Sequence, residues 1–293
     1  MNYLEVDDLS ATELIDVLDR AGETKLEPVL SGKGVALVFE KPSARTRNSM
    51  EMAVVQLGGH PVTIRPDEIG LGRRERVEDL ARMFGCYHAA LGARVFDHDE
   101  LELMASASPI PVINMLSDAA HPLQALADLL TIRQVFGQLG GLTVAYVGDG
   151  NNVCRSLCIA AGMAGMRVRV ACPRGYELSQ EDEERVSRAC TPTLTSDPRV
   201  AVSGADVVYT DAWFSMGQES QAEARRPLFA PFQVDDQLMA AAGPDAIFLH
   251  CLPAHRDEEV TDSVLDGPQS RVWQQAENRM HASRGLLSWL MEH

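Results

Sequence analysis

The 293-residue chain lacks a disulfide pattern, a signal-peptide pattern and any long hydrophobic run. None of its six cysteines form a C-x-x-C pair, so we expect free thiols and neither a disulfide framework nor a structural zinc site. No apolar run approaches the roughly 18 residues of a membrane span. The N-terminus has neither the basic region nor the apolar core of a signal peptide. These absences predict a cytoplasmic protein.

Positive charge is also scarce. The chain carries 26 Lys and Arg against 42 Asp and Glu, which gives a formal net charge of -16. This balance argues against nucleic acid or an anionic membrane surface as a partner. A small anionic substrate remains compatible with it, provided that the arginines gather in one cleft. The length is sufficient for one large or two medium-sized domains with a buried core.

Short apolar runs alternate with helical patterns, which predicts an α/β fold with parallel sheets and helices on both faces. Expected strands cover residues 35–39, 61–64, 90–95, 111–114, 142–147, 167–171, 206–210 and 246–251. Expected helices cover residues 46–57, 76–87, 98–105, 121–138, 152–163, 178–190 and 276–291, and Ser10 with Glu13 forms a capping box before a further helix.

The segment Gln138–Gly141 marks the expected domain boundary, because its two glycines end a long helical pattern. We expect one doubly wound domain over residues 1–138 and a second over residues 139–275. The helical pattern of 276–293 could return to the first domain and complete it. Residues 211–232 show little periodicity and are long enough for a loop that acts as a mobile lid.

A cluster of polar side chains follows the first expected strand. Ser43, Arg45, Thr46 and Arg47 stand where the chain turns into a helix. Helix N-termini attract anions through unpaired N–H groups and the helix dipole, and Arg forks match phosphate oxygens. This stretch therefore predicts a phosphate site. A capped helix start with solvated arginines is the structural alternative.

His121 and Gln124 lie three residues apart at the start of an expected helix, so they share one face. A His and an amide on one face can donate to a carbonyl oxygen and accept from a carbamoyl-type NH₂. A helix turn that merely contains a histidine is the alternative. Arg94 ends an expected strand and Arg279 begins the last helix, and both are either site residues or surface charges.

The stretch Gly-Asp-Gly-Asn-Asn at 148–152 follows a strand and opens a helix, as dinucleotide-binding loops do. However, Val153 occupies the place of the third glycine, and no acidic residue ends the next strand, which disfavours nicotinamide dinucleotides. We expect instead that Asn152 hydrogen-bonds a polar ligand at the carboxyl ends of the strands.

Two further strand ends carry polar groups. Asp211 follows one strand, and together with Ser215 it could bind the ammonium and carboxylate groups of an amino acid; ordinary loop residues are the alternative. Cys251 ends another strand, where it is either reactive or one of the many cysteines that are simply buried. The adjacent His250 should point to the opposite face of its strand, which argues against a simple Cys–His pair.

Together these stretches resemble the aspartate/ornithine carbamoyltransferase family, in the right order and over nearly the whole chain. They are Ser-Ala-Arg-Thr-Arg at 43–47, Arg94, His-Pro-Leu-Gln at 121–124, Gly-Asp-Gly-Asn-Asn at 148–152, Asp211 with Ser-Met-Gly at 215–217, His-Cys-Leu-Pro at 250–253 and Glu-Asn-Arg at 277–279. Ser-Met-Gly with His-Cys-Leu-Pro resembles the ornithine branch of the family rather than its aspartate branch.

The resemblance implies a first domain that binds carbamoyl phosphate, a second that binds ornithine, and a C-terminal helix packed on the first. It also implies a homotrimer or a multiple of trimers, and no metal or organic cofactor. By matching positions, carbamoyl phosphate would be bound by Ser43, Ala44, Arg45, Thr46, Arg47, Arg94, His121, Gln124, Cys251, Leu252 and Arg279. Ornithine would be bound by Asn152, Asp211, Ser215 and Met216. The catalytic residues among these would be Arg45, Arg94, His121 and Cys251.

The implied reaction transfers the carbamoyl group to the side-chain amine of L-ornithine, giving L-citrulline and phosphate for arginine biosynthesis. The neutral amine would attack the carbamoyl carbon while charge builds on the carbamoyl oxygen and phosphate leaves. Arg94, Thr46 and His121 would stabilise that oxygen, and Arg45 with Arg47 the phosphate, so catalysis would rest on positioning and electrostatics. Cys251 would then contact substrate and would not act as a covalent nucleophile.

Three positions, in two stretches, depart from the family pattern. Ala44 stands where the family usually has Thr, so we expect weaker phosphate contacts without loss of activity. In the loop 69–76, which in relatives reaches a neighbouring subunit, Gly70 and Arg76 replace the usual polar residues. Arg73 or Arg74 could substitute there.

Two other functions compete with this interpretation. One is the same chemistry on another amine, such as putrescine or an acylated ornithine; Asp211 and the Ser-Met-Gly stretch favour a free α-amino acid instead. The other is a non-catalytic relative that binds carbamoyl phosphate or a partner protein, which Ala44 and Gly70 would fit. The intact arginines at 45, 47, 94 and 279 argue against it.

Overall fold

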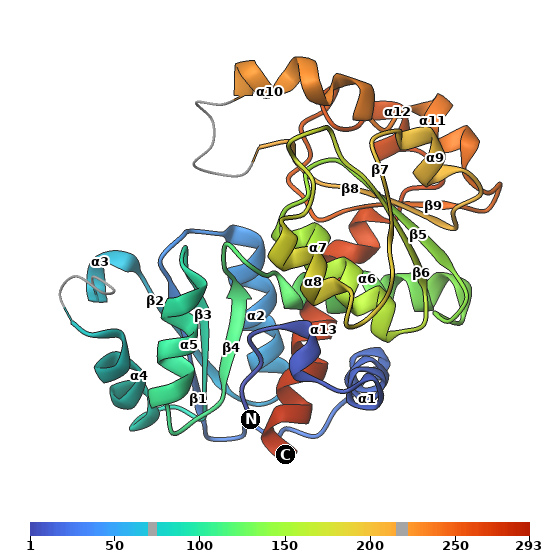
Figure 1. Cartoon of the computed structure of the whole chain (residues 1–293). Helices are drawn as coiled ribbons and strands as arrows, with labels where there is room; N and C mark the ends of the chain where they lie inside the picture. The colour runs from blue at the N-terminus through green and yellow to red at the C-terminus, as the bar shows by residue number, and fades with distance from the viewer. Residues whose placement is uncertain (70–74, 215–221) are drawn as a thin grey trace. The chain divides into compact units, whose positions relative to one another are not determined.

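The computed structural model describes residues 1–69, 75–214 and 222–293. The chain forms two compact units: unit 1 comprises Met1–Leu130 with Glu277–His293, and unit 2 comprises Thr131–Ala276. Each unit contains one parallel sheet, which confirms the predicted α/β class with two parallel sheets (Figure 1). Among the described helices, none combines the length and the apolar character needed to cross a membrane.

Unit 1 is built around a four-stranded sheet in the order β2-β1-β3-β4. Its elements are η1 (Val6–Asp8), α1 (Ala11–Gly22), β1 (Gly34–Phe39), α2 (Ala44–Gln56), β2 (His60–Ile64), α3 (Pro66–Ile69), α4 (Val77–Gly85), β3 (Ala90–Arg94), α5 (His98–Ala107), β4 (Val112–Leu116) and the start of α6 (Pro122–Phe136). Five of the six residues of β1 are buried, as expected for a parallel strand covered on both faces.

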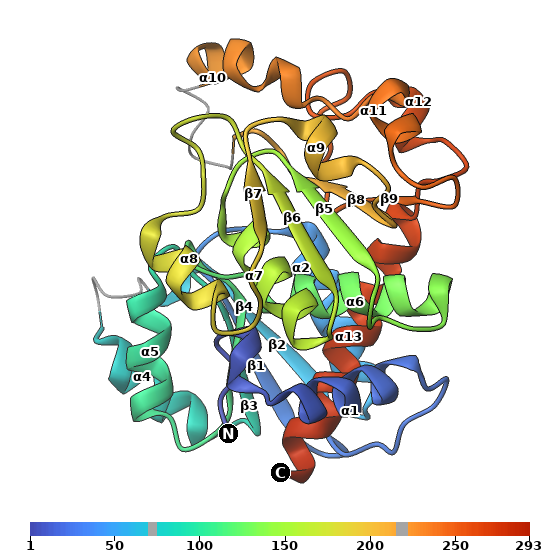
Figure 2. The same cartoon turned by 45° about the vertical axis from the view of Figure 1, so that its right-hand side comes forward.

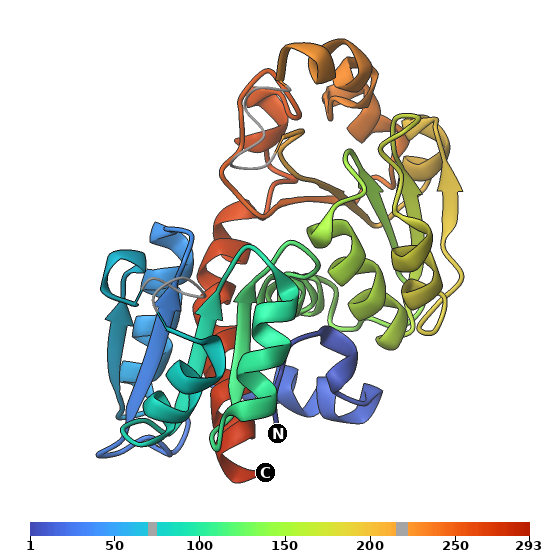
Figure 3. The ribbon, with the colours of Figure 1, turned by 60° about the vertical axis from the view of Figure 1, so that its left-hand side comes forward.

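Helices cover both faces of this sheet. Buried side chains of α4 and α5 pack against Val38 and Leu91, whereas α2 lies on the other face (Figures 1 and 3). On α1, the predicted capping box is present: Ser10 accepts from the N–H of Glu13, and the Glu13 carboxylate accepts from the N–H of Ser10. These contacts fix the scaffold that carries the phosphate-site candidate at the start of α2.

The C-terminal helix α13 (Val272–Glu292) packs on α1 and α2 of unit 1, as predicted. Gly285 is required at this packing, because a Cβ there would lie 2.7 Å from the Val17 carbonyl oxygen. Arg284 donates to the Gln56 side-chain oxygen at 3.0 Å, and Arg20 pairs with Glu292 at 2.7 Å. This packing holds Arg279, on the same helix, inside unit 1.

Unit 2 contains a five-stranded sheet in the order β7-β6-β5-β8-β9 (Figure 2). Its elements are β5 (Thr143–Val147), α7 (Asn152–Met163), β6 (Arg167–Ala171), α8 (Gln180–Val186), β7 (Thr193–Thr195), α9 (Pro198–Val202), β8 (Val207–Thr210), α10 (Ala222–Phe229), η3 (Ala230–Phe232), α11 (Asp236–Ala241), β9 (Ile247–His250), α12 (Asp262–Leu265) and the start of α13. The carboxyl ends of β5, β8 and β9 carry Gly148, Asp211 and Cys251 at one edge of the sheet.

The interpretation of 211–232 as a continuous loop is wrong in its second half, where α10 and η3 form. Pro227 lies inside α10. Among the described side chains of this helix, the buried ones are the charged Arg225 and the apolar Phe229. The helix therefore has no apolar stripe that periodicity could reveal. The segment 215–221 of the predicted lid lies outside the described residues.

Candidate active site

The start of α2 is organised by Ser43. Its hydroxyl accepts from the Thr46 N–H at 3.3 Å, and its carbonyl accepts from the Arg47 N–H at 3.1 Å. The N–H groups of a helix's first turn have no partner within the helix. Ser43 engages those of Thr46 and Arg47, so the N–H groups of Ala44 and Arg45 stand at the helix entrance, where an anion could accept from them. This is the local geometry that an anion requires.

Two buried guanidinium groups converge on the Thr46 hydroxyl. Arg94 donates to Thr46 Oγ1 at 3.2 Å, and Arg279 donates to the same oxygen at 3.4 Å. Both arginines are at most 6% exposed and Thr46 is 1% exposed. Burying like charges side by side is costly, and an anion bound beside these two guanidinium groups would lower that cost.

Arg94 reaches this position through an irregularity at the end of β3. The register between β3 and β4 shifts between Ala93 and Arg94, so that Arg94 pairs with Leu116. Bulges of this kind redirect a side chain at the end of a strand. Sequence identified Arg94 as a strand-end residue but could not reveal the shift.

His121 reports the positive potential of this site. It is 5% exposed, and burial together with the charges of Arg279 and Arg94 holds the pKa of its imidazole well below the ordinary value. The ring is therefore neutral at neutral pH, with one N–H to donate and one nitrogen to accept. A neutral imidazole suits the predicted hydrogen bond to a carbonyl oxygen.

Gln124 holds Arg279 in place. Its side-chain oxygen accepts from Arg279 at 2.5 Å, and its NH₂ group donates to the Asp128 carboxylate at 2.8 Å. Asp128 is fully buried and was not predicted, although it lies four residues after Gln124 on α6 and so on the same helix face. These two hydrogen bonds fix the orientation of the Gln124 amide.

The remaining predicted residues at the start of α2 are exposed. Ala44 is the first residue of the helix, Arg45 follows it, and the Arg47 guanidinium pairs with Glu51 at 2.8 Å. The structure thus brings together Ser43, Thr46, Arg94, Gln124 and Arg279, with the charges of Arg94 and Arg279 acting on His121. Arg45 and Arg47 stand at the same helix entrance with their side chains in solvent.

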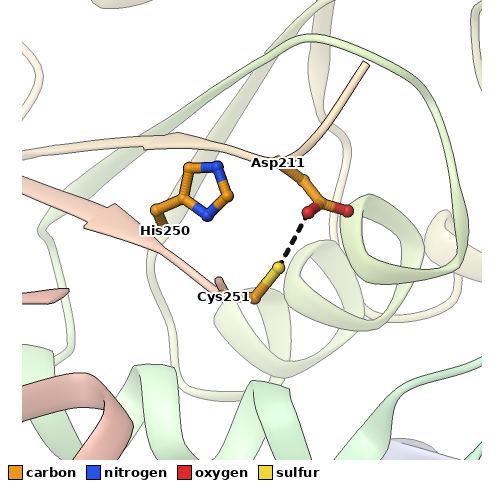
Figure 4. Close-up of side chains that lie close together, drawn as sticks. All are labelled: Asp211, His250 and Cys251. Atoms are coloured by element: carbon orange, nitrogen blue, oxygen red, sulfur yellow. Dashed lines mark hydrogen bonds between the residues drawn. The ribbon is translucent and has the colours of Figure 1, made fainter. Parts of the chain in front are cut away.

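In unit 2, Asp211 is the centre of a polar cluster at the carboxyl edge of the sheet. The Cys251 thiol donates to Asp211 Oδ1 at 2.8 Å (Figure 4), and the Ala212 N–H donates to the same oxygen at 2.8 Å. Asp211 Oδ2 accepts from the Asn151 amide at 2.9 Å. Asp211 is 8% exposed, so these bonds compensate a nearly buried carboxylate.

Asn151 makes a contact with Asp211 that was not predicted from the sequence. Its side-chain oxygen also caps α7, accepting from the N–H groups of Val153 and Cys154. Asn is a preferred N-cap residue, so this signal was present in the sequence. Asn152, the first residue of α7, is half-buried, and its contact with a ligand stays a prediction.

His250 does not pair with Cys251, as its strand position indicated. Its Nε2 lies 3.1 Å from Glu259 Oε1, and its Nδ1 accepts from the Leu252 N–H at 2.9 Å. The proton is therefore assigned to Nε2, which donates to Glu259. His250 fixes the backbone of Leu252, one of the residues predicted to contact carbamoyl phosphate.

Asp149 and Arg225 form a second buried group that sequence reasoning missed. Burial chiefly, and the charge of Asp211 in addition, raise the pKa of the Asp149 carboxyl to about 6, while Arg225 opposes this rise. Arg225 donates to Asp149 at 3.1 Å and to the Trp213 carbonyl at 2.9 Å, and it lies over the Tyr176 ring. No local sequence signal marks Arg225, because its partners are distant in sequence.

Several predicted residues cannot be placed. Ser215 and Met216, predicted for ornithine, lie outside the described residues, as do Gly70, Arg73 and Arg74 of the loop 69–76. Arg76 is described; it is exposed and pairs with Glu78 at 2.7 Å.

Comparison with known proteins identifies two family domains in the chain. Residues 1–134 match the carbamoyl-P binding domain of aspartate/ornithine carbamoyltransferase, and residues 140–290 match its Asp/Orn binding domain. An ornithine carbamoyltransferase of Acidothermus cellulolyticus is 50% identical over 303 residues, covering 99% of this chain and 96% of the relative.

Solved structures agree. The ornithine carbamoyltransferase of Pyrococcus furiosus is 46% identical with a TM-score of 0.94, and the match covers 99% of this chain and 97% of that one. A mutant N-acetyl-L-ornithine transcarbamylase is 31% identical with a TM-score of 0.89, covering 99% of both chains. On this evidence the chain belongs to the aspartate/ornithine carbamoyltransferase family.

Proposed function

We propose that this enzyme is a carbamoyltransferase that moves the carbamoyl group of carbamoyl phosphate to the side-chain amine of L-ornithine. The products are L-citrulline and phosphate, in arginine biosynthesis. The observation that carries the proposal is the pair of buried guanidinium groups on Thr46, in a chain 50% identical to an ornithine carbamoyltransferase. The phosphate group of carbamoyl phosphate would place a negative charge beside these guanidinium groups.

In this proposal unit 1 binds carbamoyl phosphate. The phosphate takes up the N–H groups of Ala44 and Arg45, the hydroxyls of Ser43 and Thr46, and the forks of Arg45 and Arg47. Arg45 and Arg47 are exposed, so both are able to turn toward the helix entrance, Arg47 by giving up a surface ion pair with Glu51 that contributes at most about 1 kcal/mol. Arg94 and Arg279 then exchange a weak hydroxyl acceptor for an anion.

The chemical step needs donors where charge develops. As the amine nitrogen forms its bond to the carbamoyl carbon, the bond from that carbon to the phosphate oxygen breaks and its electron pair leaves with phosphate. The proton that the amine loses passes to the departing phosphate. Arg94, Thr46 and His121 stabilise the carbamoyl oxygen. The depressed pKa of His121 keeps it a neutral donor rather than an acid. Gln124 keeps Arg279 aligned, and Cys251 and Leu252 complete the carbamoyl contacts.

Unit 2 binds ornithine in this proposal. The Asp211 carboxylate attracts an ammonium group, and Asn152, Ser215 and Met216 bind the remaining amino-acid end. The Cys251 thiol, already directed at Asp211, contacts the substrate and forms no covalent bond with it. The support for this assignment is the fixed position of Asp211, whose oxygens are held by Asn151, Ala212 and Cys251.

The same proposal includes a cytoplasmic homotrimer or a multiple of trimers. The support is the similarity to the family alone. Light scattering coupled to size-exclusion chromatography tests it, since a mass of about one 32.0 kDa chain would rule the trimer out.

Citrulline formation by the purified protein tests the function directly. Carbamoyl phosphate is supplied with ornithine, putrescine, N-acetylornithine or aspartate in separate reactions, and the carbamoylated product of each amine is measured, which is citrulline for ornithine alone. Turnover on ornithine alone is expected. Turnover on putrescine or N-acetylornithine instead would keep the chemistry and overturn the substrate, and inactivity on all four with phosphate still binding would favour a non-catalytic relative.

A further inference from the structure

A second group of ligand-type side chains lies in unit 2 between β9 and α12. His255, Glu258 and Glu259, called here the 255–259 cluster, each offer one ligand atom, and these atoms lie within 4.8 Å of one another. None of the three belongs to the substrate contacts proposed above. The cluster therefore needs an explanation of its own.

The cluster contains buried polar atoms that lack hydrogen-bond partners. Within the described chain, His255 Nδ1, Glu258 Oε2 and Glu259 Oε2 are all in this state. Glu259 is fully buried. Its Oε1 accepts from His250 Nε2 at 3.1 Å and from the backbone N–H of His255 at 2.5 Å. Its Oε2 lies 3.6 Å from His255 Nδ1. A buried carboxylate oxygen without a partner is costly, so the site is incomplete as it stands.

The surrounding contacts hold this incomplete arrangement in place. Gln233 donates to the carbonyls of Asp257 and Glu258 at 2.9 and 2.8 Å, which fixes the backbone. The Arg226 guanidinium donates to Glu258 Oε1 at 2.9 Å. The Phe214 ring stacks on the His255 ring with centroids 5.4 Å apart. These partners orient one oxygen of Glu258 and the plane of the imidazole, while Oε2 and Nδ1 are left for a ligand.

We propose that the 255–259 cluster binds a divalent transition-metal ion of the Zn²⁺ type through His255 Nδ1, Glu258 Oε2 and Glu259 Oε2. Two carboxylates face one guanidinium, Arg226, so a cation improves the charge balance. One imidazole with two carboxylates suits Zn²⁺ or Co²⁺ rather than Mg²⁺ or Ca²⁺, which prefer oxygen ligands alone. Three protein ligands leave a fourth position for water.

A neighbouring cluster must be separated from this one in any test. Asp211, His250 and Cys251 also offer ligand atoms close together, but both nitrogens of His250 are engaged, by Glu259 and by the Leu252 N–H. Replacing Cys251 by Ser removes the thiolate that Zn²⁺ would prefer there. Cys251→Ser is therefore the background in which the 255–259 cluster is measured.

Calorimetric titration of tag-free Cys251→Ser protein with Zn²⁺ tests the proposal. One ion per chain is expected, with at least about tenfold weaker binding after adding His255→Ala or Glu258→Gln. His281→Ala is the matched control, because the half-buried His281 lies 3.7 Å from the exposed Glu277, away from the cluster in sequence; this variant should bind as the background does. Circular dichroism and thermal unfolding establish that each variant is folded.

Two results would overturn the proposal. One is loss of the stoichiometric site in Cys251→Ser itself, which would assign binding to the thiol cluster. The other is unchanged affinity in folded His255→Ala and Glu258→Gln proteins. Anomalous diffraction at the zinc edge gives an independent answer: a peak about 2.0–2.2 Å from His255 Nδ1 supports the site, and a peak elsewhere contradicts it.

Discussion

The candidate sites of the two units have opposite electrostatic character. In unit 1, burial and then the charges of Arg279 and Arg94 lower the pKa of His121, so the site resists a further positive charge. In unit 2, burial raises the pKa of Asp149 and the charge of Asp211 adds to this rise, although the larger effect of Arg225 opposes it. Burial is the largest cause of both pKa shifts, and the neighbouring charges modify it.

This difference matches the charges of the two proposed substrates. Carbamoyl phosphate is anionic, and the positive potential around Thr46 attracts it while keeping His121 a neutral hydrogen-bond donor. Ornithine carries two ammonium groups at neutral pH, and the negative potential around Asp211 attracts them. The net charge of -16 would repel an anion from the protein as a whole, so the clustered arginines of unit 1 must reverse that field locally.

The largest effect is expected at the helix entrance of unit 1. Arg45→Ala should lower kcat about 10²–10³-fold, because one donor to the departing phosphate is lost. Thermal stability should barely change, since the Arg45 side chain is exposed. Steady-state kinetics and thermal unfolding measure both. Arg82→Ala, which breaks an exposed pair with Asp79 on α4, is the control and should leave kcat unchanged. Near-parental kcat in Arg45→Ala would remove Arg45 from the proposed site.

The raised pKa of Asp149 predicts a pH-dependent stability. A carboxyl with a pKa of about 6 in the folded protein and near 3.8 in the unfolded chain binds more protons in the folded state. Its contribution to the free energy of unfolding is therefore complete below pH ~4 and is lost as the pH rises through 6. A shift of about 2 pKa units corresponds to roughly 3 kcal/mol.

Asp149→Asn mimics the protonated carboxyl and should abolish this loss. Urea unfolding of parent and variant from about pH 4 to about pH 7 should therefore show a gap that widens in favour of the variant by about 2–3 kcal/mol. Comparing the two proteins cancels the titration of all other groups. Parallel curves would mean that Asp149 is not protonated in the folded protein near pH 5, and the contrast with His121 would fail.

Thr46→Val tests how strongly unit 1 depends on an acceptor at its centre. Val keeps the shape but removes the oxygen that accepts from Arg94 and Arg279, so the free energy of unfolding should fall by about 1–3 kcal/mol. Thr143→Val is the matched control, because this buried hydroxyl accepts from Arg167 at 3.0 Å, an exposed arginine that water can solvate. Equal losses in both variants would show that the buried guanidinium pair has no special need for the hydroxyl.

The sequence predicted the regular part of the fold because short apolar runs and helical periods are local signals. The strand 167–171 was predicted with the bounds that β6 has, and the helix 152–163 with those of α7. Short elements of unit 2 were not predicted. β7 has three residues, none of them buried, and α10 contains Pro227 and a buried arginine. Such segments are stabilised by tertiary contacts that no window of sequence contains.

The site shows the same division. Ser43 and Thr46 were found because a hydroxyl-rich helix start after a strand is a local pattern. Asn151 was not predicted, although its capping role was visible in sequence. Asp128 and Arg225 were missed because a buried charge is recognised only through its partners, Gln124 for the former and Asp149 for the latter.

The smallest effect is expected at Ala44, the first residue of α2. Ala44→Thr would place a hydroxyl beside the N–H groups proposed to bind phosphate, and one added hydrogen bond is worth about 0.5–1.5 kcal/mol. The gain is reduced by the poorer helix propensity of Thr. We therefore expect the KM for carbamoyl phosphate to fall two- to fivefold, about 0.4–1 kcal/mol, with the KM for ornithine unchanged. Because the new hydroxyl belongs to unit 1 alone, a change confined to ornithine would contradict the assignment of the phosphate to this helix start.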